Sequence, residues 1–132
     1  MTMTPGIREH LRRRLFLAAQ EEVKAMLDAL PAPVKKHAQN VPVLFEMKPR
    51  PSDVRLGIAP DTLGLFSGAA LNESHDANPD TPTQITLYME NIWDYVAHRS
   101  PDFREEIRRT YLHELGHYLG LDEDDLYIRD LD

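Results

Sequence analysis

The stretch that decides the fold of this chain is Ser100-Pro-Asp-Phe-Arg-Glu-Glu-Ile-Arg-Arg-Thr-Tyr-Leu-His-Glu-Leu-Gly-His-Tyr-Leu-Gly120. Its apolar residues recur every four positions, at Phe103, Ile107, Tyr111, Leu115 and Leu119. This spacing places them on one face of a helix. Ser100 suits the N-cap, Pro101 the first helical position, and Gly120 a left-handed C-terminal end. We therefore expect an amphipathic helix over residues 101–119.

The end of this predicted helix carries His113-Glu-Leu-Gly-His117. Residues four apart are neighbours on a helix, with Cβ atoms about 5–6 Å apart, so both imidazoles leave the same face. Two nitrogens bound to tetrahedral zinc at about 2.0–2.1 Å lie roughly 3.3 Å apart, which converging rings can reach. Glu114 is offset by about 100°, so it can reach a water at the metal rather than the metal itself. The pattern predicts a zinc site with a general base beside it.

A catalytic zinc ion needs three protein ligands and one open position, so a third ligand must be found. Gly120 can turn the chain back toward the metal, and the first carboxylates after it are Asp122 and Glu123. The alternative is that the run from Asp122 to Asp125 is only a solvated acidic segment. More remote candidates for the third ligand are Glu73, His75 and Glu90.

The first part of the chain predicts another amphipathic helix, over residues 7–30. Its apolar residues are spaced by three and four, with charged residues between them: Leu11, Leu15, Ala19, Val23, Met26 and Leu30. Pro31 and Pro33 end the helix, because proline cannot donate the backbone hydrogen bond that a helix requires. We expect this stripe to pack in the core.

The middle of the chain has the period of strands. Four short stretches are candidates, namely residues 41–47, 54–58, 63–66 and 85–89. A short helix is expected to begin near Asn91 and to stop before Pro101. The order of elements is helix, strands, short helix and long helix, which predicts an α+β fold in one domain over residues 1–132.

Composition narrows the class of protein. The chain has 132 residues, no cysteine and a net charge of -7. The lack of cysteine therefore excludes disulfides, cysteine-ligated metals and thiol nucleophiles. The negative net charge disfavours binding to nucleic acid, which depends on neutralising phosphates with basic residues. The basic run Arg12 to Arg14 is interpreted as a solvated helix face. The apolar run Leu15–Ala19 is too short for a signal peptide or a membrane span, so we expect a soluble, cytoplasmic protein that binds neither nucleic acid nor membrane.

The segment from Arg108 to Leu126 resembles the signature of the small bacterial zincin-like metallopeptidases. Leu63-Gly-Leu-Phe-Ser-Gly68, the strand Gln84-Ile-Thr-Leu87 and the opening helix Phe16 to Pro31 are similar to that family too. The resemblance therefore covers most of the chain from about Phe16 onward.

This resemblance implies a minimal zincin fold, in which the motif helix packs on a small mixed sheet of three to four strands. It also implies Zn²⁺ bound by His113 and His117, with Glu114 as the catalytic residue. Metzincins have a similar extended pattern, with a third ligand three residues after the glycine, and that position is Glu123 here. The ligand is usually His in metzincins and often Asp in the zincin-like family, so glutamate departs from both.

The leading hypothesis is a zinc-dependent peptidase or amidase. Glu114 would take a proton from the attacking water and pass it to the leaving amine. Tyr118 and Tyr127 are candidates to stabilise the oxyanion, although packing explains each of them as well. The strand at residues 84–89 could bind a peptide or protein substrate along its edge.

Two other functions are considered. A metal-dependent nuclease would need a third histidine after Gly120 and a basic surface, and the sequence has neither. The other alternative is a non-catalytic metal-binding or interaction module built on a zincin scaffold, since a fold does not establish turnover.

Overall fold

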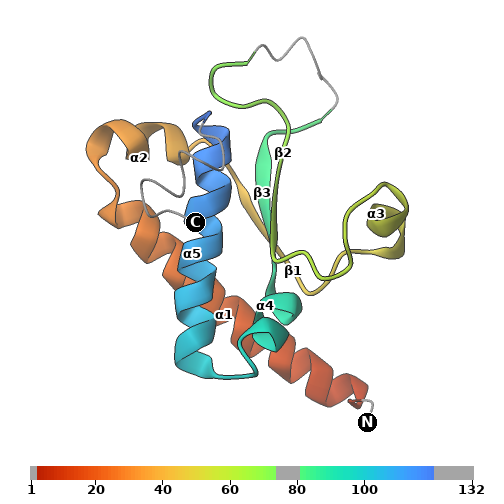
Figure 1. The fold of residues 1–132 in the computed structure, drawn as a ribbon. Helices are drawn as coiled ribbons and strands as arrows, with labels where there is room; N and C mark the ends of the chain where they lie inside the picture. Colours follow the sequence, from red (N-terminus) through yellow and green to blue (C-terminus); the bar gives the residue numbers. More distant parts are fainter. Residues whose placement is uncertain (1–2, 74–80, 121–132) are drawn as a thin grey trace.

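The computed structural model describes residues 3–73 and 81–120 (Figure 1). Its elements, in chain order, are α1 (Pro5–Ala29), α2 (Ala32–Ala38), β1 (Val43–Glu46), α3 (Pro51–Arg55), β2 (Gly64–Ser67), β3 (Gln84–Tyr88), α4 (Met89–Tyr95) and α5 (Ser100–Tyr118). The expected α+β order of helix, strands and long helix is confirmed. Among the described residues, none of the helices combines the length and apolar character that a membrane span requires.

The three strands form one mixed sheet in the order β1-β3-β2. β1 runs parallel to β3, with Val43 opposite Ile85, whereas β2 runs antiparallel to it, with Leu65 opposite Thr86. The central position of β3 explains why four of its five residues are buried. A strand that is covered on both faces buries side chains on both sides, so its burial does not alternate as it does in a strand with one exposed face.

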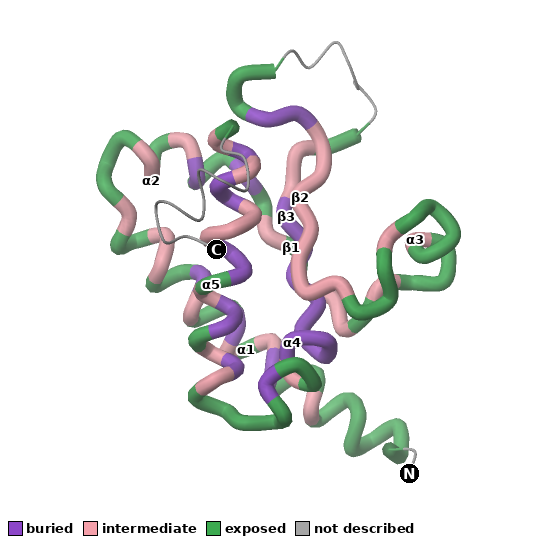
Figure 2. The backbone as a smooth tube through the Cα atoms, in the orientation of Figure 1, coloured by how far each residue is buried: buried purple, intermediate pink, exposed green. Residues whose placement is uncertain are grey.

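Two long helices, α1 and α5, lie together on one side of this sheet (Figure 1). Buried residues line the sides of α5 and of the strands that face each other (Figure 2). The core joins the apolar stripes of both helices to the central strand: Leu15, Ala19, Val23, Ile85, Leu87, Phe103, Ile107, Tyr111 and Leu115. Burying a side chain of this size stabilises the fold by about 1.5–3 kcal/mol. The core role expected for the stripe of α1 is confirmed.

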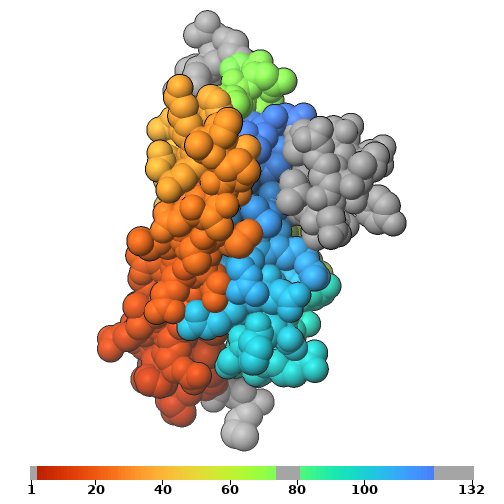
Figure 3. Space-filling model, turned by 90° about the vertical axis from the view of Figure 1, so that its left-hand side faces the viewer, coloured from red at the N-terminus to blue at the C-terminus, as the bar shows by residue number. Residues whose placement is uncertain are grey.

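A polar contact also joins α1 to α5, which run side by side in Figure 3. Glu22 accepts hydrogen bonds from Arg108 at 2.7 Å and from Arg104 at 3.1 Å. Burial alone would raise the pKa of the Glu22 carboxyl, but the two arginines outweigh it and hold that pKa below its ordinary value. Glu22 therefore stays ionised and links the two helices.

The strand expected at residues 54–58 is wrong, because the chain forms the end of the short helix α3 and then a turn there. Pro51 occupies the first turn, where its missing N–H costs nothing, and Asp53 accepts a hydrogen bond from the Arg50 backbone N–H at 2.9 Å. The apolar residue that follows, Leu56, is 84% exposed rather than buried in a sheet. The proline in the first turn and the hydrogen bond to Asp53 therefore favour a helix here more strongly than the alternation of apolar residues favours a strand.

The ends of the long helices differ slightly from expectation. α1 begins at Pro5, because the side chain of Thr4 accepts a hydrogen bond from the Ile7 backbone N–H at 3.2 Å. In α5, Arg99 is the N-cap and Ser100 is the first helical residue, so the N-cap expected at Ser100 is wrong by one position. Gly120 has φ +84°, which confirms the left-handed turn after the helix.

Candidate metal centre

His113 and His117 lie on adjacent turns near the C-terminal end of α5, and both are half-buried. Their Nε2 atoms are 3.2 Å apart, and their ring centroids are 4.8 Å apart with an interplanar angle of 77°. Two imidazole ligands of a tetrahedral zinc ion need nearly this nitrogen separation, given Zn–N bonds of about 2.0–2.1 Å. The histidines therefore fit a shared zinc ion through Nε2.

Glu114 lies beside the two histidines and contacts β2. Its Oε1 atom accepts a hydrogen bond from the backbone N–H of Phe66 at 3.1 Å. A hydrogen bond from a fixed backbone group restricts the orientation of a carboxylate without neutralising it. The strand thus orients Glu114, a contact that sequence spacing could not reveal, because 48 residues separate the two partners.

The backbone of β2 alternates in direction along the strand. Leu63 accepts a hydrogen bond from the Tyr88 N–H at 2.9 Å. Leu65 is the next residue whose backbone N–H and carbonyl point toward β3. Gly64 and Phe66 alternate with these positions, so their backbone groups point to the outer edge of the strand. The outer edge of β2 is therefore the side of the sheet that meets Glu114.

Gly64 allows this edge to approach α5 closely. A Cβ atom at this position would lie 2.5 Å from Cγ2 of Thr110 and 3.3 Å from Cγ of Glu114. The first distance is far below an ordinary van der Waals contact, so a side chain at this position would force either Thr110 or the strand to shift. The lack of a side chain at Gly64 thus brings the strand edge to the motif.

A cavity of about 250 Å³ lies between β2 and α5. It is lined by Leu63, Gly64, Glu106, Arg109, Thr110, His113 and Glu114. Glu106 is 8% exposed, accepts a hydrogen bond from Thr110 at 3.0 Å and lies 3.7 Å from Arg109. Sequence reasoning did not identify these residues. The available signal is that Glu106 and Thr110 precede His113 by seven and three positions, which places all three on one helix face.

The described residues contain no group of three side chains arranged to hold a metal ion. Glu90, a remote candidate for the third ligand, is paired with Arg8 at 2.8 Å and is not brought into a group with the two histidines. Glu73 is not brought into a group with the two histidines. His75, Asp122 and Glu123 lie outside the residues that the structure describes.

Two further expectations concern the substrate. Tyr118 is buried, and its ring packs edge-on against Phe66 with centroids 6.0 Å apart, which supports its packing role. Tyr127 lies outside the described residues. The expected free edge at residues 84–89 is wrong, because β3 is paired with β1 on one side and β2 on the other. The outer strand next to the histidines is β2.

Comparison with protein families gives a match over residues 38–131, more than half of the chain. The matching family is described as zincin-like metallopeptidase. The matched range includes the three strands and α5 with its two histidines. A comparison with individually curated proteins found no match.

Proposed function

The chain belongs to the zincin-like metallopeptidase family, and from this premise we propose that it is a zinc-dependent peptidase. The observation that carries the proposal is the convergence of two Nε2 atoms, 3.2 Å apart, beside a carboxylate held at a strand edge. This combination provides metal ligands, a base and a peptide-binding backbone in one place.

His113 and His117 would hold the zinc ion through Nε2, and Glu123 is our choice for the third ligand, with Asp122 as the alternative. When bound, zinc supplies Lewis-acid polarisation of a carbonyl and a water whose pKa is lowered toward about 7. Neutral imidazoles and a carboxylate suit this metal in the absence of cysteine. The family description supports a metal-dependent peptidase, and the assignment of ligands is ours.

Glu114 would act as the general base. Its carboxylate takes a proton from the attacking water and then gives that proton to the leaving nitrogen of the cleaved peptide bond. The hydrogen bond from the Phe66 N–H to Oε1 limits rotation of the carboxylate, so the base keeps one orientation through both transfers. A positioned base of this kind contributes about 10²–10⁴ to a rate.

A peptide substrate would lie along the outer edge of β2. Gly64 points its backbone N–H and carbonyl to that edge, and Phe66 points its carbonyl there, while the Phe66 N–H stays bonded to Glu114. An extended peptide can add to this edge as a further strand. Main-chain hydrogen bonds would then hold the peptide beside Glu114 whatever its side chains are. The net charge of -7 disfavours a nucleic-acid substrate.

This proposal predicts metal-dependent peptide hydrolysis. The full chain loaded with zinc should cleave a peptide library or an unfolded protein, and mass spectrometry of the products locates the cleaved bonds. A chelator should stop the reaction, and added zinc should restore it. The matched control is His113→Ala, which should neither bind zinc tightly nor cleave.

Two results would contradict the proposal in different ways. Cleavage that persists in His113→Ala or in the presence of chelator would point to a contaminating peptidase. Tight zinc binding without cleavage of any peptide would favour a metal-binding module instead of an enzyme.

A further inference from the structure

A second cavity, of about 660 Å³, is lined by residues of α4 and of the segments that precede α3 and β2. Leu63 lines both this cavity and the smaller one that contains His113 and Glu114. The residue that the two cavities share immediately precedes β2, the strand along which we place the substrate. A substrate side chain extending past the metal centre would reach the larger cavity first at Leu63.

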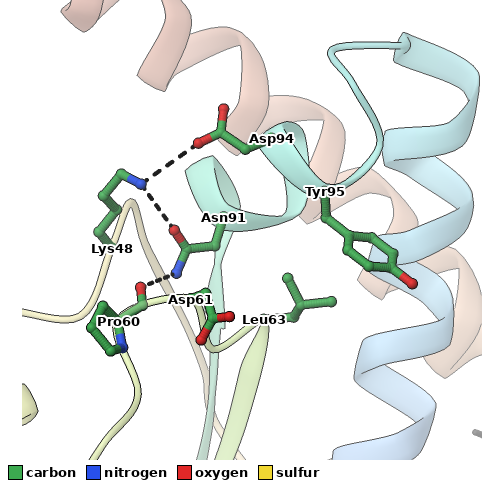
Figure 4. Close-up of a pocket in the computed structure, with 7 residues that line it drawn as sticks. All are labelled: Lys48, Pro60, Asp61, Leu63, Asn91, Asp94 and Tyr95. Carbon is green, nitrogen blue, oxygen red and sulfur yellow. Dashed lines mark hydrogen bonds and ion pairs between the residues drawn. The ribbon is translucent and has the colours of Figure 1, made fainter.

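One wall of the larger cavity is a fixed polar network (Figure 4). Asn91 is only 6% exposed, and its Nδ2 atom donates hydrogen bonds to the carbonyls of Pro60 at 2.8 Å and Thr62 at 2.9 Å. Its Oδ1 atom accepts a hydrogen bond from Lys48 Nζ at 3.1 Å, and Lys48 lies 3.6 Å from Asp94. The lysine charge is thus already paired with a carboxylate, and Asn91 is held by three hydrogen bonds.

The remaining charge in the cavity belongs to Asp61, which is exposed and forms no ion pair within the part of the chain that the structure describes. Leu63 lies between Asp61 and Tyr95 in Figure 4. Tyr95 is 66% exposed, so its ring is available on this surface. The cavity therefore offers an apolar surface, an aromatic ring and one uncompensated carboxylate.

We propose that the cavity at Asp61, Leu63 and Tyr95 is a specificity subsite that binds a lysine or arginine side chain of the peptide substrate. This inference rests on the proposed function. The aliphatic part of such a side chain packs on Leu63, and its cation meets Asp61 and the Tyr95 ring. An acidic side chain would face Asp61 and Asp94 with only the paired Lys48 to offset them.

The test compares peptides that differ by one residue. Lys, Gln or Glu is placed at successive positions on both sides of the cleaved bond, and kcat/KM is measured with the zinc-loaded full chain. At one position, Lys should exceed Gln by about five-fold, the size expected for a partly exposed ion pair with an aromatic contact. Glu should be the poorest of the three.

Three variants identify the residue responsible. Asp61→Asn should bring the Lys to Gln ratio close to one, and Asp61→Lys should reverse the order so that Glu exceeds Lys. Asp28→Asn is the matched control, because it removes an exposed carboxylate from the last turn of α1, away from this cavity. It should keep the ratio of the parent protein.

The outcomes separate this proposal from the proposed function. Cleavage with no preference at any position, or with a preference that survives in Asp61→Asn, overturns the subsite and leaves the peptidase standing. If no peptide is cleaved, the peptidase fails, and fluorescence anisotropy with labelled Lys and Gln peptides decides the subsite. Tighter binding of the Lys peptide that depends on Asp61 supports it, whereas equal or absent binding overturns it.

Discussion

His113, Glu114 and His117 were predictable from the sequence because their relation depends only on helix geometry. The spacing of four brings the two imidazoles together on any α-helix, and their Nε2 atoms lie 3.2 Å apart in the structure. The contact from Phe66 to Glu114 depends on how β2 docks against α5, so local spacing could not predict it. The same holds for Glu90, whose pairing with Arg8 joins residues 82 positions apart.

At the scale of single residues, we predict that Glu123 is the third zinc ligand. Glu123→Ala should weaken zinc binding more than the roughly 10- to 100-fold typical of residues that only support a ligand. Asp122→Ala should bind zinc nearly as well as the parent, because we assign the longer side chain of Glu123, and not that of Asp122, to the metal. Competition with a chelating dye measures both affinities.

The reverse order of these two variants would make Asp122 the ligand. If both variants bind zinc as tightly as the parent, the acidic segment after Gly120 is only a solvated run, and the assignment of a closing carboxylate there is wrong.

At the scale of elements, the sequence predicted which segments are regular but not how the strands are ordered. Alternation at residues 84–89 indicates a strand, yet nothing local says that β1 and β2 pair with its two sides. Four consecutive residues of β3 are buried because other elements surround it, and its alternating sequence does not reveal this. At residues 54–58, the helix start at Pro51 and Asp53 is a stronger local signal than the alternation of apolar residues.

The link between α1 and α5 predicts a pH-dependent stability. The folded pKa of Glu22 lies below its ordinary value of about 4.3, so its stabilising contribution is present above that pH. The contribution is lost as the pH falls through the lower, folded-state pKa. Glu22→Gln should therefore reduce the free energy of unfolding by about 1 kcal/mol at pH 7, and by much less once the parent carboxyl is protonated.

Urea unfolding of the parent and the variant at pH 7 and at successively lower pH values measures this difference. The matched control is Glu21→Gln, because Glu21 is more exposed and contacts only Arg104 of the two arginines. A difference that stays constant as the pH falls would show that the charge of Glu22 does not link the helices.

At the scale of the whole molecule, β2 and α5 together place the candidate metal centre and the proposed substrate-binding edge next to each other. His113 and Glu114 line the smaller cavity, the larger cavity shares Leu63 with it, and the outer edge of β2 runs beside Glu114. α1 precedes the range matched by the family, yet it contributes Leu15, Ala19 and Val23 to the core behind α5. The scaffold thus supports the site from the side opposite to the substrate edge.

The central claim is that Glu114 acts as a base at a zinc site formed by His113 and His117. The most direct measurement is zinc content together with peptide hydrolysis for the parent and Glu114→Gln. We predict equimolar zinc in both proteins, with hydrolysis lower by about 10² or more in the variant, because the amide cannot accept the proton. Hydrolysis at the parental rate would contradict the claim, and loss of zinc from Glu114→Gln would make Glu114 a ligand instead of a base.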